Sequence, residues 1–110
     1  MLLVCRFAVP AADAPAFRAR VHRALELLTA APGCTGGQAA RAPDDPERWV
    51  LVVRFTSIDA YRRASSPFPV REHVVPLLAE ALTDEPAAYE VLVDAAAGAV
   101  TARDSLRAEQ

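Results

Sequence analysis

The sequence has no lysine, no asparagine, only two cysteines and no long apolar run. All 12 basic residues are arginines, and 14 acidic residues leave a net charge of -2, so the basic excess typical of nucleic-acid binding is missing. No apolar stretch approaches the roughly 18 residues of a membrane helix. We therefore expect no nucleic-acid partner and no membrane anchor.

The two cysteines, Cys5 and Cys34, make neither a disulfide framework nor the spacing of a metal site. We expect both to be free thiols that pack as small hydrophobic side chains, in a reducing cytoplasm. The short apolar run at the N-terminus contains Arg6 and has no charged lead-in. It is therefore interpreted as a strand and not as a signal peptide.

Residues 49–55 form the most strand-like stretch of the chain, because they are rich in β-branched and aromatic types. A strand alternates its side chains, so neither face of this one suits water, and both must be covered. One face carries Trp49, Leu51, Val53 and Phe55, and the other carries Val50, Val52 and Arg54.

The remaining elements follow from apolar spacing and from proline, glycine and capping residues. We predict a strand over 2–9, a helix capped by Asp13, a weak strand over 34–41, a helix from Ser57 to about 64, a helix over 70–82 and a strand over 88–94. A bulge or an edge position explains Gly36 and Gly37 in the weak strand. Pro76 is expected to kink or divide the helix that contains it.

This order predicts an α+β fold of the ferredoxin-like βαββαβ type with an antiparallel sheet, formed by residues 1–94. Right-handed crossovers put both helical segments on one side of the sheet. The other side is left apolar and uncovered, so we expect a homodimer that packs sheet against sheet. Residues 95–110 are interpreted as a C-terminal tail, frayed or wrapped around the partner.

Several segments together resemble the antibiotic biosynthesis monooxygenase family, over roughly residues 1–93. They are Pro-Gly-Cys at 32–34, Arg41, Asp-Asp-Pro-Glu-Arg-Trp at 44–49, Arg-Phe at 54–55 and the stretch 57–63. The resemblance implies a dimeric α+β barrel. It also implies small oxygenases that oxidise polycyclic aromatic substrates without metal or flavin, with haem-degrading relatives. Such oxygenases are associated with an asparagine, a tryptophan and a tyrosine in the pocket, and here Trp49 is the only tryptophan.

Charges set into apolar strands are the first candidates for a site. Arg6, Arg54 and Glu90 meet on one sheet face if the strand registers agree, because buried charges must be paired. An arginine there would hold a substrate carboxylate or enolate oxygen. The alternative is an ion pair at the rim, or an arginine that extends to solvent.

His73 is the candidate base, since a phenolic substrate is oxidised after losing a proton and histidine titrates near neutral pH. The alternative is a partly exposed helix histidine with no task. His22, between Arg18 and Glu26, is interpreted as solvated. Four aromatic residues are candidates for the wall of the pocket, with packing in the core as the alternative reading. They are Trp49, Tyr61, Phe68 and Tyr89.

The sequence thus favours a small cytoplasmic enzyme of secondary metabolism that oxidises an aromatic or polyketide-like molecule. His73 would act as base, Arg54 or Arg6 would stabilise the anion, and Tyr61 or Trp49 would position the ring. A non-catalytic dimeric binding or assembly module is the alternative, favoured by an interior that Trp49, Leu51 and Phe55 fill. A haem-handling protein with His73 as iron ligand is a third reading.

Overall fold

The computed structural model describes residues 1–106. Its strands and helices are listed here in chain order. They are β1 (Leu2–Ala8), the short 3-10 turn η1 (Ala11–Asp13), α1 (Ala14–Thr29), β2 (Cys34–Ala42), β3 (Asp45–Phe55), α2 (Ile58–Ala64), α3 (Phe68–His73), α4 (Val75–Leu78), β4 (Ala88–Tyr89), β5 (Val93–Ala96) and β6 (Ala99–Ala102).

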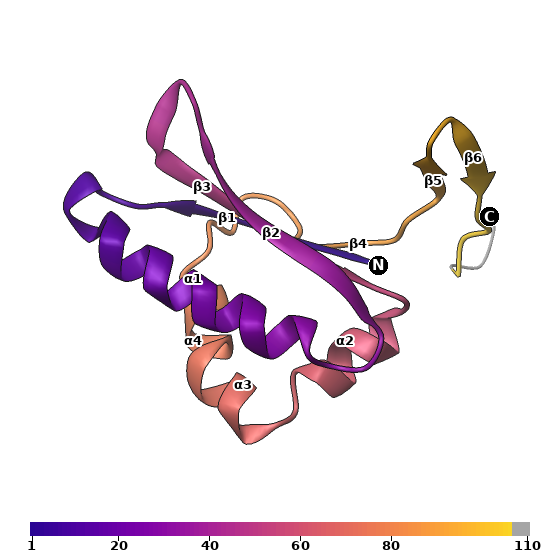
Figure 1. Cartoon of the computed structure of the whole chain (residues 1–110), viewed down its shortest axis with the longest axis horizontal. Helices are drawn as coiled ribbons and strands as arrows, with labels where there is room; N and C mark the ends of the chain where they lie inside the picture. Colours follow the sequence, from indigo (N-terminus) through magenta and orange to yellow (C-terminus); the bar gives the residue numbers. More distant parts are fainter. Residues whose placement is uncertain (107–110) are drawn as a thin grey trace.

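The main sheet has four antiparallel strands in the order β2-β3-β1-β4. All four helices lie on one side of this sheet (Figure 1). The ferredoxin-like α+β fold predicted from the sequence is therefore confirmed, and so is the placement of the helices on a single face.

The residues predicted to begin or divide the helices largely do so. α1 begins directly after Asp13, although the Asp13 side chain makes no capping hydrogen bond. The Ser57 hydroxyl oxygen caps α2 by accepting a hydrogen bond from the Ala60 backbone N–H at 3.0 Å. Pro76 divides the last helical region, and α3 begins at Phe68, inside the interruption expected over 65–69, because the first turn of a helix tolerates proline.

β2 is the edge strand of the sheet, and its register with β3 shifts between Cys34 and Gly36. Both explanations offered for the glycines are therefore confirmed. Gly37 faces α1, where an added Cβ would lie 3.0 Å from Leu25 Cδ2 and 3.0 Å from the Val52 carbonyl oxygen. The absence of a side chain at Gly37 lets α1 pack close to β2.

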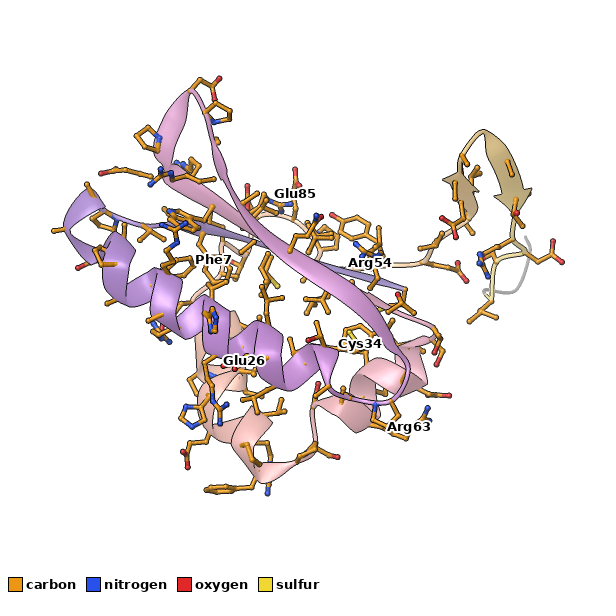
Figure 2. All side chains as sticks on the ribbon, viewed as in Figure 1. Phe7, Glu26, Cys34, Arg54, Arg63 and Glu85 are labelled. Atoms are coloured by element: carbon orange, nitrogen blue, oxygen red, sulfur yellow. The ribbon has the colours of Figure 1, made fainter. Side chains whose placement is uncertain are left out.

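The core lies between the sheet and the helices. The inner face of β1 and β3 is buried, and Figure 2 shows the Phe7 side chain between the sheet and α1. The outer face of the same strands carries Leu2, Val4, Val50 and Val52, which stay partly exposed. The alternation expected for β3 is confirmed, and one apolar sheet face lacks cover within this chain.

The strand predicted over 88–94 is wrong in its extent. β4 is only Ala88–Tyr89, and the chain then leaves the sheet to form the separate hairpin β5–β6 (Figure 1). The hairpin closes through Ala97 and Gly98, both at positive φ, as a two-residue turn requires. Residues 107–110 of the predicted tail lie outside the described residues.

Candidate functional site

Two hollows lie on the helical side of the sheet. One is a groove of about 620 Å³ between the first half of α1 and the β2–β3 hairpin. The other is a cavity of about 220 Å³ where β1 meets α2 and the residues around α4. Small-molecule sites have volumes of roughly 300–1,000 Å³, so the groove has the size for an aromatic ligand and the cavity does not.

The groove borders a face of α1 that combines small and basic side chains. Ala14, Arg18 and His22 follow one another at four-residue spacing, and side chains at that spacing share a face of a helix. Across the groove stand Trp49 of β3 and Arg41 of β2, which are direct cross-strand partners. Alanine at Ala11, Ala14 and Ala19 leaves the space between these elements unfilled.

Trp49 forms the inner wall of the groove. Its ring packs edge-on against Phe17 with centroids 5.3 Å apart, and the Arg41 guanidinium lies 5.5 Å from the ring centroid. The indole Nε1–H is buried and has no hydrogen-bond partner, the single buried side-chain donor or acceptor in this condition within residues 1–106. Leaving such a donor unpaired costs about 1–3 kcal/mol, and because the atom is buried, an acceptor reaches it only if a neighbouring side chain such as Arg41 moves.

Arg18 and Arg41 bring positive charge to the groove. Neither has a carboxylate within ion-pair distance in the described part of the chain. His22 stands beside them, and its Nδ1 lies 3.5 Å from Glu26 Oε1. That contact leaves Nε2 as the nitrogen available to a ligand.

The family model for antibiotic biosynthesis monooxygenases matches residues 1–67. The chain belongs to the antibiotic biosynthesis monooxygenase family. No protein of curated function matches it.

Solved structures agree with this assignment. SnoaB, a cofactor-independent oxygenase from Streptomyces nogalater, is similar at 27% identity over 74% of this chain and 82% of that chain, with a TM-score of 0.62. A putative antibiotic biosynthesis monooxygenase from Nitrosomonas europaea is 16% identical over 77% of this chain and 87% of that chain, with a TM-score of 0.61. A conserved Methanosarcina mazei protein is 18% identical over 76% and 82% of the two chains, with a TM-score of 0.64. The last two likenesses show the fold alone.

The smaller cavity is lined by Tyr61 and Cys5, among other residues. Tyr61 packs edge-on against Phe55 with centroids 5.4 Å apart, and burial raises the pKa of the Cys5 thiol against the opposing effect of Arg6. Glu85 lies at the rim and pairs with Arg6 at 3.0 Å. The apolar lining and the protonated thiol are typical of a gap in a packed core. As expected, Cys5 and Cys34 are free cysteines, although Cys34 is only partly buried.

The charges predicted to meet do not come together. Arg54 lies opposite Leu2 of β1, four residues from Arg6, which corresponds to roughly 13 Å along the strand. Arg6 pairs with Glu85, which lies on the loop that runs along the edge of β1. The Glu90 carboxylate follows β4 and accepts hydrogen bonds from Ser105 Oγ at 2.8 Å and the Leu106 N–H at 2.6 Å. The chain leaves the sheet before Glu90 reaches the face that carries Arg6 and Arg54.

The remaining predicted site residues are dispersed. His73, at the end of α3, lines neither hollow, and its Nε2 lies 2.9 Å from Glu72 Oε1. Phe68 is 65% exposed, and Tyr89 is 38% exposed on the outer strand β4. Trp49 therefore lines the groove, Tyr61 lines the smaller cavity, and the four aromatic residues form no common wall.

Arg18, His22 and Arg41 are the groove residues that the sequence reasoning missed. Their polarity placed Arg18 and His22 on the solvent side of α1, and they are indeed exposed. The signal was the four-residue spacing of Arg18 and His22 beside the small residues Ala14 and Ala19. Which strand this helix face meets depends on the packing, which spacing alone does not determine.

Within residues 1–106, no three side chains of histidine, cysteine, aspartate or glutamate gather as metal ligands would. No helix of that part is both long enough and apolar enough to cross a bilayer.

Proposed function

We propose that this chain is a small oxygenase of secondary metabolism that oxidises an aromatic, polyketide-like molecule bound in the groove between α1 and the β2–β3 hairpin. The observation that carries the proposal is a groove of about 620 Å³ that is lined by Trp49 together with Arg18, His22 and Arg41. Family membership and the likeness to a cofactor-independent oxygenase support chemistry without metal or flavin.

The reaction would take its electrons from the substrate. Removal of a proton from an acidic CH or phenolic OH produces an anion rich enough in electrons to react with dioxygen. When a ring CH₂ becomes a carbonyl, the carbon loses four electrons and both of its hydrogens. One oxygen atom of O₂ enters the ring and the other leaves as water, so no external reductant is needed.

The groove supplies candidates for each role. His22 is the histidine positioned to accept the proton, because its Nδ1 faces Glu26 and its Nε2 is available to the substrate. The Trp49 Nε1–H would donate to the substrate oxygen on which negative charge develops. His73, expected to be the base, lies outside the groove. The interior is filled by Leu51 and Phe55, as the non-catalytic alternative required, but Trp49 still faces an open groove.

Anthrone, a tricyclic ketone with an acidic CH₂, is a suitable test substrate. Oxygen uptake and formation of anthraquinone are measured with the wild-type chain and with His22→Gln and Trp49→Phe. We expect each variant to lose about 100-fold in kcat/KM, because general bases and oxyanion donors each contribute on that order.

The matched control is His73→Gln, which changes the other histidine in the same way. Its turnover should equal that of the wild type. Loss of turnover in His73→Gln together with full activity in His22→Gln would show that His73 on α3 is the base, and it would refute the groove assignment. A wild-type chain that binds anthrone without consuming oxygen would indicate the non-catalytic module instead.

The proposed enzyme is a homodimer that packs through its outer sheet faces. Val4 and Val52 are register partners at the middle of that face, with Leu2 and Val50 beside them, and Arg54 and Arg6 stand opposite these last two. Two copies related by a two-fold axis would cover each other.

The hairpin β5–β6 is proposed to rest on the partner. Two-stranded hairpins are marginal in water on their own, and Val93 and Val100 are 66% and 67% exposed. For the enzyme's location we propose the cytoplasm, because Cys5 and Cys34 are free cysteines and a reducing compartment preserves thiols.

A further inference from the structure

We propose that the groove selects aromatic ligands that carry a carboxylate, with the anion held by Arg18 and Arg41. The assignment rests on the proposed function, since it names the substrate class of the same groove. Arg18 comes from α1 and Arg41 from β2, so the two guanidinium groups approach the groove from opposite sides.

Five of the described arginines have no carboxylate within ion-pair distance, and Arg18 and Arg41 are the two of them that line the groove. Six of the described arginines have a carboxylate within ion-pair distance: Arg6, Arg20, Arg23, Arg48, Arg62 and Arg103. Arg18 and Arg41 have none. Glu26 contacts His22 and Arg23, and a Glu47 carboxylate oxygen accepts from the Ala11 N–H at 3.4 Å. The two arginines of the groove lining therefore have no carboxylate partner of their own.

The chemistry of the walls narrows the ligand to a carboxylate attached to a ring. A guanidinium offers a planar fork of donors that matches the two oxygens of a carboxylate. The Trp49 indole and the small alanine side chains provide a flat apolar surface for the ring. The Trp49 Nε1–H adds a donor without a partner. Arg41 is exposed, so it can turn from the indole toward the ligand without disturbing the core.

The sole tryptophan makes a direct readout available. Uniformly ¹⁵N-labelled protein shows one indole N–H signal, which belongs to Trp49. The intact chain is titrated with 1-naphthoate and, separately, with 1-naphthamide, which has nearly the same shape and no charge. We expect 1-naphthoate to shift the indole proton downfield and to bind about tenfold more tightly than 1-naphthamide, as a net gain of about 1.4 kcal/mol from charge-assisted hydrogen bonds predicts.

Variants then locate the anion. Arg18→Gln and Arg41→Gln should each weaken 1-naphthoate binding about tenfold and leave 1-naphthamide binding unchanged. Arg63→Gln is the matched control, because Arg63 is an exposed arginine without a carboxylate partner on α2, away from the Phe7 end of α1 (Figure 2). It should bind both compounds like the wild type.

The outcomes separate this inference from the proposed function. Equal affinity for the two compounds in the wild type, with the same indole shift, overturns the carboxylate assignment and leaves the aromatic groove intact. No indole shift with either compound overturns both. Because the comparison of compounds uses the unaltered chain, it holds even if an arginine variant fails to fold.

Discussion

Arg20 and Glu80 form a two-pronged ion pair, with Nη1 3.0 Å from Oε1 and Nη2 2.7 Å from Oε2. Arg20 lies on α1 and Glu80 follows α4, so the pair joins helices that are far apart in sequence. It also helps to orient the helix that supplies Arg18 and His22 to the groove. The hydrogen bond from Arg20, more than the charge alone, holds the pKa of the Glu80 carboxyl below its usual range.

The first prediction follows from that pKa. A carboxyl whose pKa is lowered on folding stabilises the fold above its unfolded pKa, and the stabilisation is lost as the pH falls through the folded pKa. We expect Glu80→Gln to lower the free energy of unfolding at pH 7 by about 0.5–1 kcal/mol, a small value because the pair is exposed. Urea unfolding of the wild type and the variant at pH 7, and again at about pH 3, measures the difference in stability with the Glu80 carboxyl ionised and with it largely protonated. A difference from the wild type that persists undiminished at the acid limit would contradict the assignment.

The close approach of α1 to β2 at Gly37 supports a second prediction. In Gly37→Ala the new methyl would meet Leu25 Cδ2 and the Val52 carbonyl oxygen, both at 3.0 Å. Backbone and helix would have to shift, so we expect a loss of about 1–3 kcal/mol in the free energy of unfolding. Gln38→Ala, at the neighbouring exposed position, should stay within about 0.5 kcal/mol of the wild type. Equal stability of Gly37→Ala and the wild type would show that the helix has room to move.

The outer sheet face gives a third prediction. Val52 lies in the middle of that face, opposite Val4 on one side and Gln38 on the other. If two copies pack there, Val52→Glu buries an unpaired charge at the interface. We therefore expect the dissociation constant of the dimer to rise by at least about 100-fold. Sedimentation velocity over a concentration series measures it. The matched control is Val75→Glu on α4, where the valine is 45% exposed on the helical side, and its self-association should not change. A monomeric wild type at micromolar concentration would exclude the proposed dimer.

The sequence alone predicted the order of strands and helices as far as β4, the alternation of side chains along β3, and the cap at Ser57. These features depend on local causes. Alternating apolar residues select a strand, a hydroxyl satisfies free N–H groups at a helix start, and Pro76 cannot continue a helix. The resemblance to the oxygenase family followed from the same segments, and the family model confirmed it.

Only the tertiary structure decided which residues share a site. His73 and Trp49 are both suitable in type, yet α3 carries His73 away from both hollows. From the sequence, His22 and Arg18 were interpreted as solvent-facing residues of the first helix. They line the groove because α1 packs beside Arg41 and Trp49. Glu90 was placed beside Arg6, but β4 ends at Tyr89. Local spacing determines which face of an element a side chain occupies, whereas the neighbour of that face depends on how the elements pack.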